Sequence, residues 1–180
     1  NPDRLVVMWP GLGGIAVAAS MDGGRSWQRE TVADGELGTR RRGAIVAGDA
    51  GSLHALARAA TEGATGLFYR TSTDGGRTWR QAAKLAGADA RNPDLVRAPD
   101  GVLAAVWEEA SGPESTIFYA LSLDDGKSWG TRTKLSDGGS EATHPRVVVT
   151  KDGYLVLWLE RWRSSERVLQ RGYIGVQHRH

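Results

Sequence analysis

Three copies of one eight-residue pattern, spaced evenly along the chain, constrain its fold more than any other feature. Each copy has the form S-x-D-x-G-x-S/T-W, and the copies begin at Ser20, Ser72 and Ser122. Repetition at an interval of about fifty residues, with strand-like segments on both sides, is typical of β-propellers. The sequence therefore predicts an all-β fold built from four-stranded antiparallel blades.

The residue types in the pattern predict a hairpin turn that stabilises itself. The Asp carboxylate can accept hydrogen bonds from N–H groups of the turn, and the glycine permits a positive φ without steric cost. The Trp is expected to bury its ring between neighbouring sheets, with a partner for its indole N–H. We expect these residues to be structural rather than catalytic or metal-binding: Asp22, Trp27, Asp74, Trp79, Asp124 and Trp129.

The pattern resembles the Asp box, or BNR repeat, of the sialidase superfamily and its non-enzymatic relatives. The resemblance implies a propeller of six or seven blades, with the boxes at the periphery and away from the active face. It also favours a periplasmic or secreted protein. Two functions follow from it: a glycoside hydrolase acting on sialylated or other acidic glycans, or a non-catalytic propeller that binds a glycan or protein, or scaffolds an assembly.

A second recurring unit completes the blades. Residues 92–107 and 144–158 each contain a short apolar strand, an Asp-Gly turn and a second strand that ends in Trp, which is a strong hairpin signal. One domain is expected, with a partial blade, two complete blades and a second partial blade at residues 1–35, 36–86, 87–136 and 137–180. About three and a half blades cannot close a ring. We therefore expect the remainder of its own polypeptide, or a second chain, to complete it.

Composition excludes several classes of partner. The net charge is only +2, and no long block of like charge is present, so nucleic-acid binding is not expected. The chain has no cysteine, which rules out disulfides and thiolate metal sites, and no apolar run long enough to span a membrane. No spacing relates His144 to the terminal His178 and His180, so neither a metal nor a cofactor is predicted.

The resemblance also suggests where a substrate would bind. Sialidases hold the substrate carboxylate with three arginines, because a guanidinium can donate two parallel hydrogen bonds to it. The first of these lies in an Arg-Ile-Pro motif at the start of an inner strand, and Arg91-Asn92-Pro93 resembles that motif. Arg41 is the repeat-equivalent second candidate. His144 opens the next inner strand and is expected near Arg91, although Arg91 as a solvated or salt-bridged loop residue is the alternative.

Catalytic candidates follow from the same resemblance. Sialidases use a tyrosine nucleophile activated by a glutamate. Tyr173 lies in the final stretch, where Gly172 to Gly175 occupy the place at which an Asp box might begin, and Glu109 and Glu160 each lie two residues after a blade Trp. These three are the candidate catalytic residues. Asp94 and Arg146 occupy equivalent positions on neighbouring inner strands and could form an ion pair in the channel.

Overall fold

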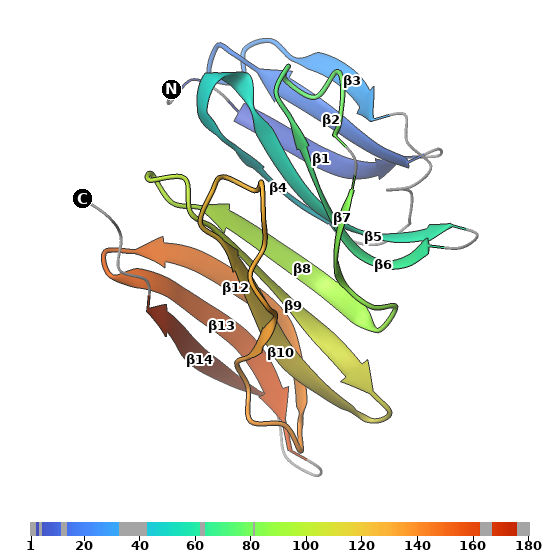
Figure 1. Ribbon diagram of the computed structural model, residues 1–180, viewed down its shortest axis with the longest axis vertical. Coiled ribbons are helices and arrows are strands. Elements are labelled where there is room, and N and C mark those ends of the chain that lie inside the picture. Colours follow the sequence, from blue (N-terminus) through green and yellow to red (C-terminus); the bar gives the residue numbers. More distant parts are fainter. Residues whose placement is uncertain are drawn as a thin grey trace. The chain divides into compact units, whose positions relative to one another are not determined.

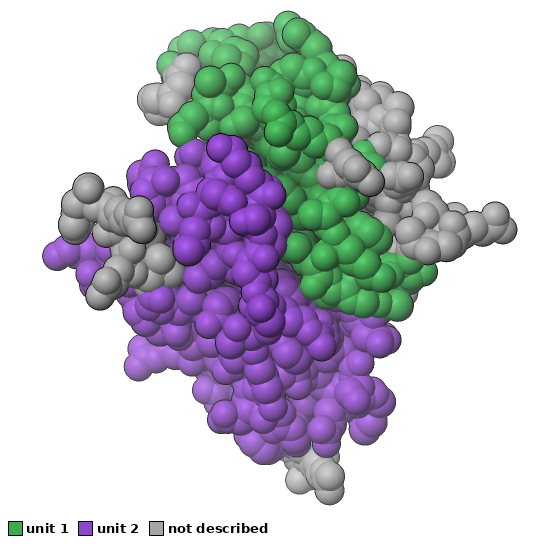
Figure 2. All heavy atoms as spheres, in the orientation of Figure 1, with its two compact units in different colours: residues 1–88 green, residues 89–180 purple. Residues whose placement is uncertain are grey.

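The computed structural model of the chain describes residues 3, 5–11, 14–32, 43–61, 64–80, 82–162 and 167–175. Apart from one 3-10 turn at Asp49–Gly51, the regular elements of this described part are all β-strands (Figure 1). The chain divides into two compact units, residues 1–88 and residues 89–180 (Figure 2). The all-β fold with antiparallel sheets predicted from the repeats is confirmed.

The first unit contains two antiparallel sheets in which successive strands are neighbours. Their central strands pack around Val17, Leu53 and Ala57, which are buried. The three-stranded sheet consists of β1 (Leu5–Gly11), β2 (Gly14–Ser20) and β3 (Gln28–Val32). The four-stranded sheet consists of β4 (Gly43–Ala47), β5 (Leu53–Thr61), β6 (Ala64–Ser72) and β7 (Ala83–Ala86).

The second unit contains a four-stranded antiparallel meander followed by a three-stranded one. A single parallel bridge between Ser115 and Glu141 joins the two. The first meander consists of β8 (Ala90–Arg97), β9 (Leu103–Ser111), β10 (Glu114–Ser122) and β11 (Thr133–Lys134). The second consists of β12 (Glu141–Thr150), β13 (Gly153–Arg161) and β14 (Val168–Gly175).

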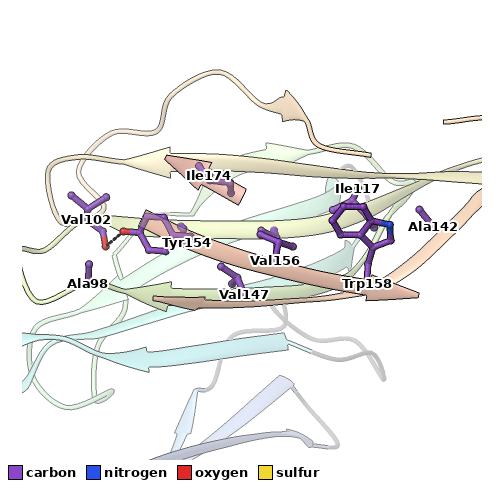
Figure 3. Close-up of a cluster of buried hydrophobic side chains, with 11 residues drawn as sticks. Ala98, Val102, Ile117, Ala142, Val147, Tyr154, Val156, Trp158 and Ile174 are labelled. Atoms are coloured by element: carbon purple, nitrogen blue, oxygen red, sulfur yellow. Dashed lines mark hydrogen bonds between the residues drawn. The ribbon is translucent and has the colours of Figure 1, made fainter. Parts of the chain in front are cut away.

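The core of the second unit lies between these two meanders. Ile117 on β10 belongs to the same buried cluster as Val156 and Trp158 on β13 (Figure 3). Tyr154 adds a polar link, because its buried hydroxyl donates a hydrogen bond of 3.1 Å to the carbonyl oxygen of Val102 (Figure 3). Along β13 the buried side chains alternate with less buried ones from Tyr154 to Glu160. Successive residues of a strand face opposite sides, so one face of β13 packs against the first meander.

Candidate functional site

The Asp boxes form the predicted turns, the first between β2 and β3, the second between β6 and β7, and the third between β10 and β11. In the first box, Asp22 Oδ1 accepts the backbone N–H of Ser26 at 2.8 Å, and Oδ2 accepts the Ser26 hydroxyl at 2.6 Å. Asp74 and Asp124 make the same pair of contacts with Thr78 and Ser128. The aspartates are therefore used within their own turns.

These hydrogen bonds also set the charge state of the boxes. The hydroxyl of Ser26 is the largest cause that lowers the pKa of Asp22, to about 2. The hydroxyl of Ser128 similarly lowers the pKa of Asp124 to about 2, and Thr78 lowers the pKa of Asp74 well below its usual range. A carboxylate held in its charged form by local donors suits a structural turn better than proton transfer.

The box tryptophans differ from the prediction that they bury their rings between sheets. Trp79 is partly buried against the core of the first unit, whereas Trp27 is 44% exposed. The indole N–H groups of these two residues turn back to their own boxes: Trp27 donates to the carbonyl of Gly24 at 3.1 Å, and Trp79 to that of Gly76 at 3.0 Å. The two rings differ in burial because different amounts of the chain pack over them. Hydrogen bonding within the turn fixes the ring even where little packs over it.

Two inner strands of the second unit, β8 and β12, each contain a β-bulge near their beginning. The register of β8 shifts between Arg91 and Asp94, and that of β12 shifts between Thr143 and Arg146. Asn92 and His144, each followed by proline, have positive φ values of 45° and 56° at these bulges. Non-glycine residues rarely adopt this conformation, although Asn and His adopt it more readily than most, and bulges of this kind often redirect a side chain beside a functional site.

The bulges bring the predicted binding residues to one edge of the unit. Arg91 precedes the first bulge, and His144 lies in the second; both side chains are exposed. Among the described residues Arg91 has no ion-pair partner. Arg41, the repeat-equivalent candidate, lies outside the described residues. An exposed guanidinium at this place has its donors available for an anionic group.

Two carboxylates connect the two meanders. The sequence had not assigned a role to Glu108, and it had suggested an ion pair with Arg146 for Asp94. Glu108 on β9 is 5% exposed, and its Oε2 accepts the backbone N–H of His144 at 2.8 Å. Asp94 on β8 accepts the backbone N–H of Val147 at 3.0 Å. Burial raises the pKa of Asp94. These two contacts fix β12 on both sides of its bulge.

The expected ion pair between Asp94 and Arg146 does not form. Asp94 instead accepts the N–H of Val147, and Arg146 Nη1 donates to the carbonyl of Pro145 at 2.8 Å. The two charges are still close enough that Arg146 opposes the effect of burial on the pKa of Asp94. The bulge explains the difference, because it places the backbone of β12, rather than the guanidinium, against the carboxylate.

Glu109 and Glu160, the candidate partners of a tyrosine nucleophile, occupy matching structural positions. Each accepts the indole N–H of the Trp two residues earlier, Trp107 at 2.9 Å and Trp158 at 3.1 Å. Arg132 also pairs with Glu109. Residues two apart on a strand share a face, so the recurring Trp-x-Glu sequence contained the signal for this contact.

Tyr173 lies far from Glu160. Tyr173 pairs with Leu155 near one end of β13, whereas Glu160 pairs with Val168 near the other. Five residues along a strand correspond to about 17 Å. The structure therefore does not bring these two together, and Tyr173 is 51% exposed on the outermost described strand of its sheet.

A pocket of about 480 Å³ opens at the edge where β10 and β12 begin and β13 ends. It lies at the end of the unit where β8, with Arg91, begins. Within the described ranges, no cluster of three or more His, Asp or Glu side chains could hold a metal. No helix in that part of the chain is long and apolar enough to cross a membrane. The pocket is lined by Pro113, Glu114, Gly139, Ser140, Glu141 and Arg161.

Several solved structures of carbohydrate-active proteins are similar to this chain. The phage phi92 endosialidase matches with a TM-score of 0.70 and 12% identity, over 99% of this chain and 34% of that chain. The intramolecular trans-sialidase from Ruminococcus gnavus matches with a TM-score of 0.63 and 19% identity, over 96% and 40%. The endo-arabinase from Bacteroides thetaiotaomicron matches with a TM-score of 0.64 and 13% identity, over 96% and 71%. This chain thus spans well under half the length of the two sialidases.

The sequence itself matches a family of repeat proteins. Among curated proteins no sequence matches this chain. The model of the BNR repeat-like domain, however, matches residues 13–157, a stretch that includes all three Asp boxes. The chain therefore belongs to the BNR repeat-like domain family, and its fold is that of a sialidase-like β-propeller.

Proposed function

We propose that this chain binds an acidic glycan at the edge where β8 and β12 begin. Arg91 provides the main contact to the carboxylate, with His144 beside it and Arg41 one repeat earlier. The observation that supports this most directly is the exposed Arg91 before a bulge, without an ion-pair partner among the described residues. A guanidinium in that state can form two parallel hydrogen bonds with a carboxylate.

Binding is favoured over hydrolysis by the positions of the predicted catalytic residues. Both oxygens of Glu160 are engaged, Oε1 by the hydroxyl of Ser140 at 2.5 Å and Oε2 by the indole of Trp158. A base for a tyrosine nucleophile must reach the hydroxyl within hydrogen-bond distance, and Tyr173 lies near the opposite end of β13 from Glu160. A non-catalytic glycan-binding propeller thus explains these residues with fewer rearrangements.

Hydrolysis of the same glycan is the second candidate. Asp94 favours it, because burial raises the pKa of its carboxyl group at the bulge of an inner strand. A carboxyl group with a raised pKa is suited to general-acid catalysis. In this scheme Tyr173 would be the nucleophile, with Glu109 as its partner, because Glu160 lies near the opposite end of β13 from Tyr173.

The binding proposal is tested by comparing two arginine variants in their affinity for an acidic sugar. Calorimetry of the full chain should detect 3′-sialyllactose, and Arg91→Ala should weaken its binding by about tenfold or more, the range for a hydrogen bond to a charged group. Arg25→Ala, in an Asp-box turn, is the matched control and should leave the affinity unchanged. Equal losses in both variants, or no loss in Arg91→Ala, would rule out this placement.

The catalytic alternative has its own readout. Release of fluorophore from a fluorogenic sialoside by the wild-type chain, lost in Tyr173→Phe and retained in Arg25→Ala, would establish hydrolysis. Binding of 3′-sialyllactose without any such release supports the non-catalytic function.

We also infer that the outer face of β12–β14 is covered in the functional protein. Val148, Leu155 and Tyr173 are register partners across the three strands, and Val148 and Tyr173 are substantially exposed. A blade normally buries both faces on its neighbours. The remainder of its own polypeptide or a second chain would supply that cover.

A further inference from the structure

The pocket bounded by Glu114, Ser140, Glu141 and Arg161 is separate from the residues assigned to the acidic group. Its volume of about 480 Å³ falls within the range of about 300–1,000 Å³ for small-molecule sites. It lies at the starts of β10 and β12, at the same edge as Arg91 on β8. A ligand held at Arg91 could therefore extend toward this pocket.

The floor of the pocket is fixed by buried polar contacts. Ser140 is 3% exposed and donates its hydroxyl to Glu160 Oε1 at 2.5 Å. Its backbone carbonyl accepts the N–H of Ser115 at 3.1 Å, and Glu160 is in turn held by Trp158. A binding wall whose side chains are already held by a second layer of hydrogen bonds loses little freedom when a ligand arrives.

The walls carry both acceptors and donors. Glu141 pairs with Arg161 at 2.6 Å and with Arg167 at 3.7 Å. Glu114 has no ion-pair partner among the described residues. The lining contains two carboxylates and one guanidinium, and Arg167 beside Glu141 brings a second guanidinium. Among the described side chains these charges balance, so the pocket favours neither an anionic nor a cationic ligand.

Adjacent hydroxyl groups fit this lining better than a cation does. Carboxylates accept hydrogen bonds from hydroxyls, and a guanidinium donates to them, so the pair Glu114 and Arg161 offers complementary contacts to a diol. A cation would face the positive charge of Arg161, and the described side chains form no cluster of three metal ligands. We propose that the pocket is a subsite for a neutral sugar unit, an inference that rests on the proposed glycan-binding function.

The subsite is tested on the full chain with named probes. Calorimetry with lactose and with xylobiose should show binding of at least one of these neutral sugars. Hydrogen exchange with the bound sugar should then slow in peptides that cover residues 112–116 and 138–142. Glu114→Ala should weaken binding by about tenfold, because a charge-assisted hydrogen bond is lost, and Glu114→Gln should weaken it less.

Asp152→Ala is the matched control, since it removes an exposed carboxylate from the β12–β13 turn at the other end of the sheet. It should leave the affinity unchanged. The subsite is overturned if neither neutral sugar binds, if Glu114→Ala binds as well as the wild type, or if calcium chloride protects the pocket peptides while the sugars do not.

The same experiments separate this inference from the proposed function. Binding of 3′-sialyllactose that depends on Arg91, without binding of either neutral sugar, overturns the subsite and leaves the acidic site intact. Binding of a neutral sugar that depends on Glu114, with no effect of Arg91→Ala on sialyllactose, supports the subsite and overturns the assignment of Arg91.

Discussion

At the scale of single residues, the pKa values of two kinds of carboxyl group are shifted in opposite directions. The carboxylates of the Asp boxes are surrounded by donors, and hydrogen bonds lower their pKa. Asp94 accepts one backbone N–H in a buried place, and desolvation raises its pKa. Stability linked to the box carboxylates is therefore gained as pH rises, whereas stability linked to Asp94 is lost as pH rises.

Asp124→Asn should lower the melting temperature at pH 7. Both carboxylate oxygens of Asp124 accept hydrogen bonds, from Ser122 and Ser128 at 2.5–2.8 Å, and an amide nitrogen cannot accept them. The pKa of Asp124 falls from 3.8 to about 2, so its contribution is present above pH 3.8 and is lost as pH falls through about 2. Circular-dichroism melts across this range should show the difference from wild type narrowing. A constant difference would contradict the linkage.

Asp94→Asn should have the opposite effect. The amide oxygen of Asn can still accept the N–H of Val147, while the cost of burying a charge disappears. Because the pKa of Asp94 is raised above 3.8, the gain should be present at pH 7 and vanish below pH 3.8, where the wild-type carboxyl is protonated. Asp94→Ala, which lacks the acceptor, should melt lower than the wild type at both pH values. A lower melting temperature for Asp94→Asn at pH 7 would refute this account.

At the scale of elements, the hydrogen bonds within a turn could be predicted from the sequence, whereas the contacts between strands far apart in the sequence could not. The box turns follow from the spacing of Ser, Asp, Gly and Ser or Thr, all within eight residues, and the structure reproduces their contacts. The exposure of Trp27 depends on what packs over it, which no local pattern contains. The contacts of Glu108 and Asp94 with β12 depend equally on the packing of strands far apart in sequence.

For the candidate site residues, too, the sequence predicted the strands on which they lie but not the conformation or the distances of these residues. The similarity of Arg91-Asn92-Pro93 to His144-Pro145 in the repeat predicted that both open inner strands. The structure places Asn92 and His144 two and three residues after the first residues of β8 and β12, in the bulges. The bulges themselves were not predicted, since a positive φ before proline leaves no simple sequence signature. The separation of Tyr173 from Glu160 follows from the register of β13 and β14, which sequence alone does not fix.

The bulge of β8 can be tested through its backbone. Asn92 has a φ of 45°, a conformation that glycine adopts freely and β-branched residues avoid. Asn92→Gly should therefore be tolerated, whereas Asn92→Val should lower the free energy of unfolding by about 1–3 kcal/mol. Urea denaturation measures both variants. Equal stability of the two would show that the left-handed conformation at this position does not constrain the fold.

At the scale of the whole molecule, the outer face of β12–β14 is an exposed apolar surface of the second unit. Leu169 and Tyr173 on β14 and Val148 on β12 are exposed on it. The opposite face of the same strands packs against the first meander through Val147, Val156 and Ile174. A strand set that is apolar on both faces is typical of a blade with a neighbour on each side.

This face should make the isolated chain associate with itself. Sedimentation velocity should show species larger than the 19.3 kDa monomer, and Leu169→Glu should shift the distribution toward the monomer because a charge on the face must lose its hydration on contact. Leu123→Glu is the matched control: Leu123 is more exposed than Leu169, 72% against 63%, but lies in an Asp-box turn away from this face. It should leave association unchanged. A monodisperse monomer in the wild type, or the same shift in both variants, would show that the outer face of β12–β14 does not mediate contact between chains.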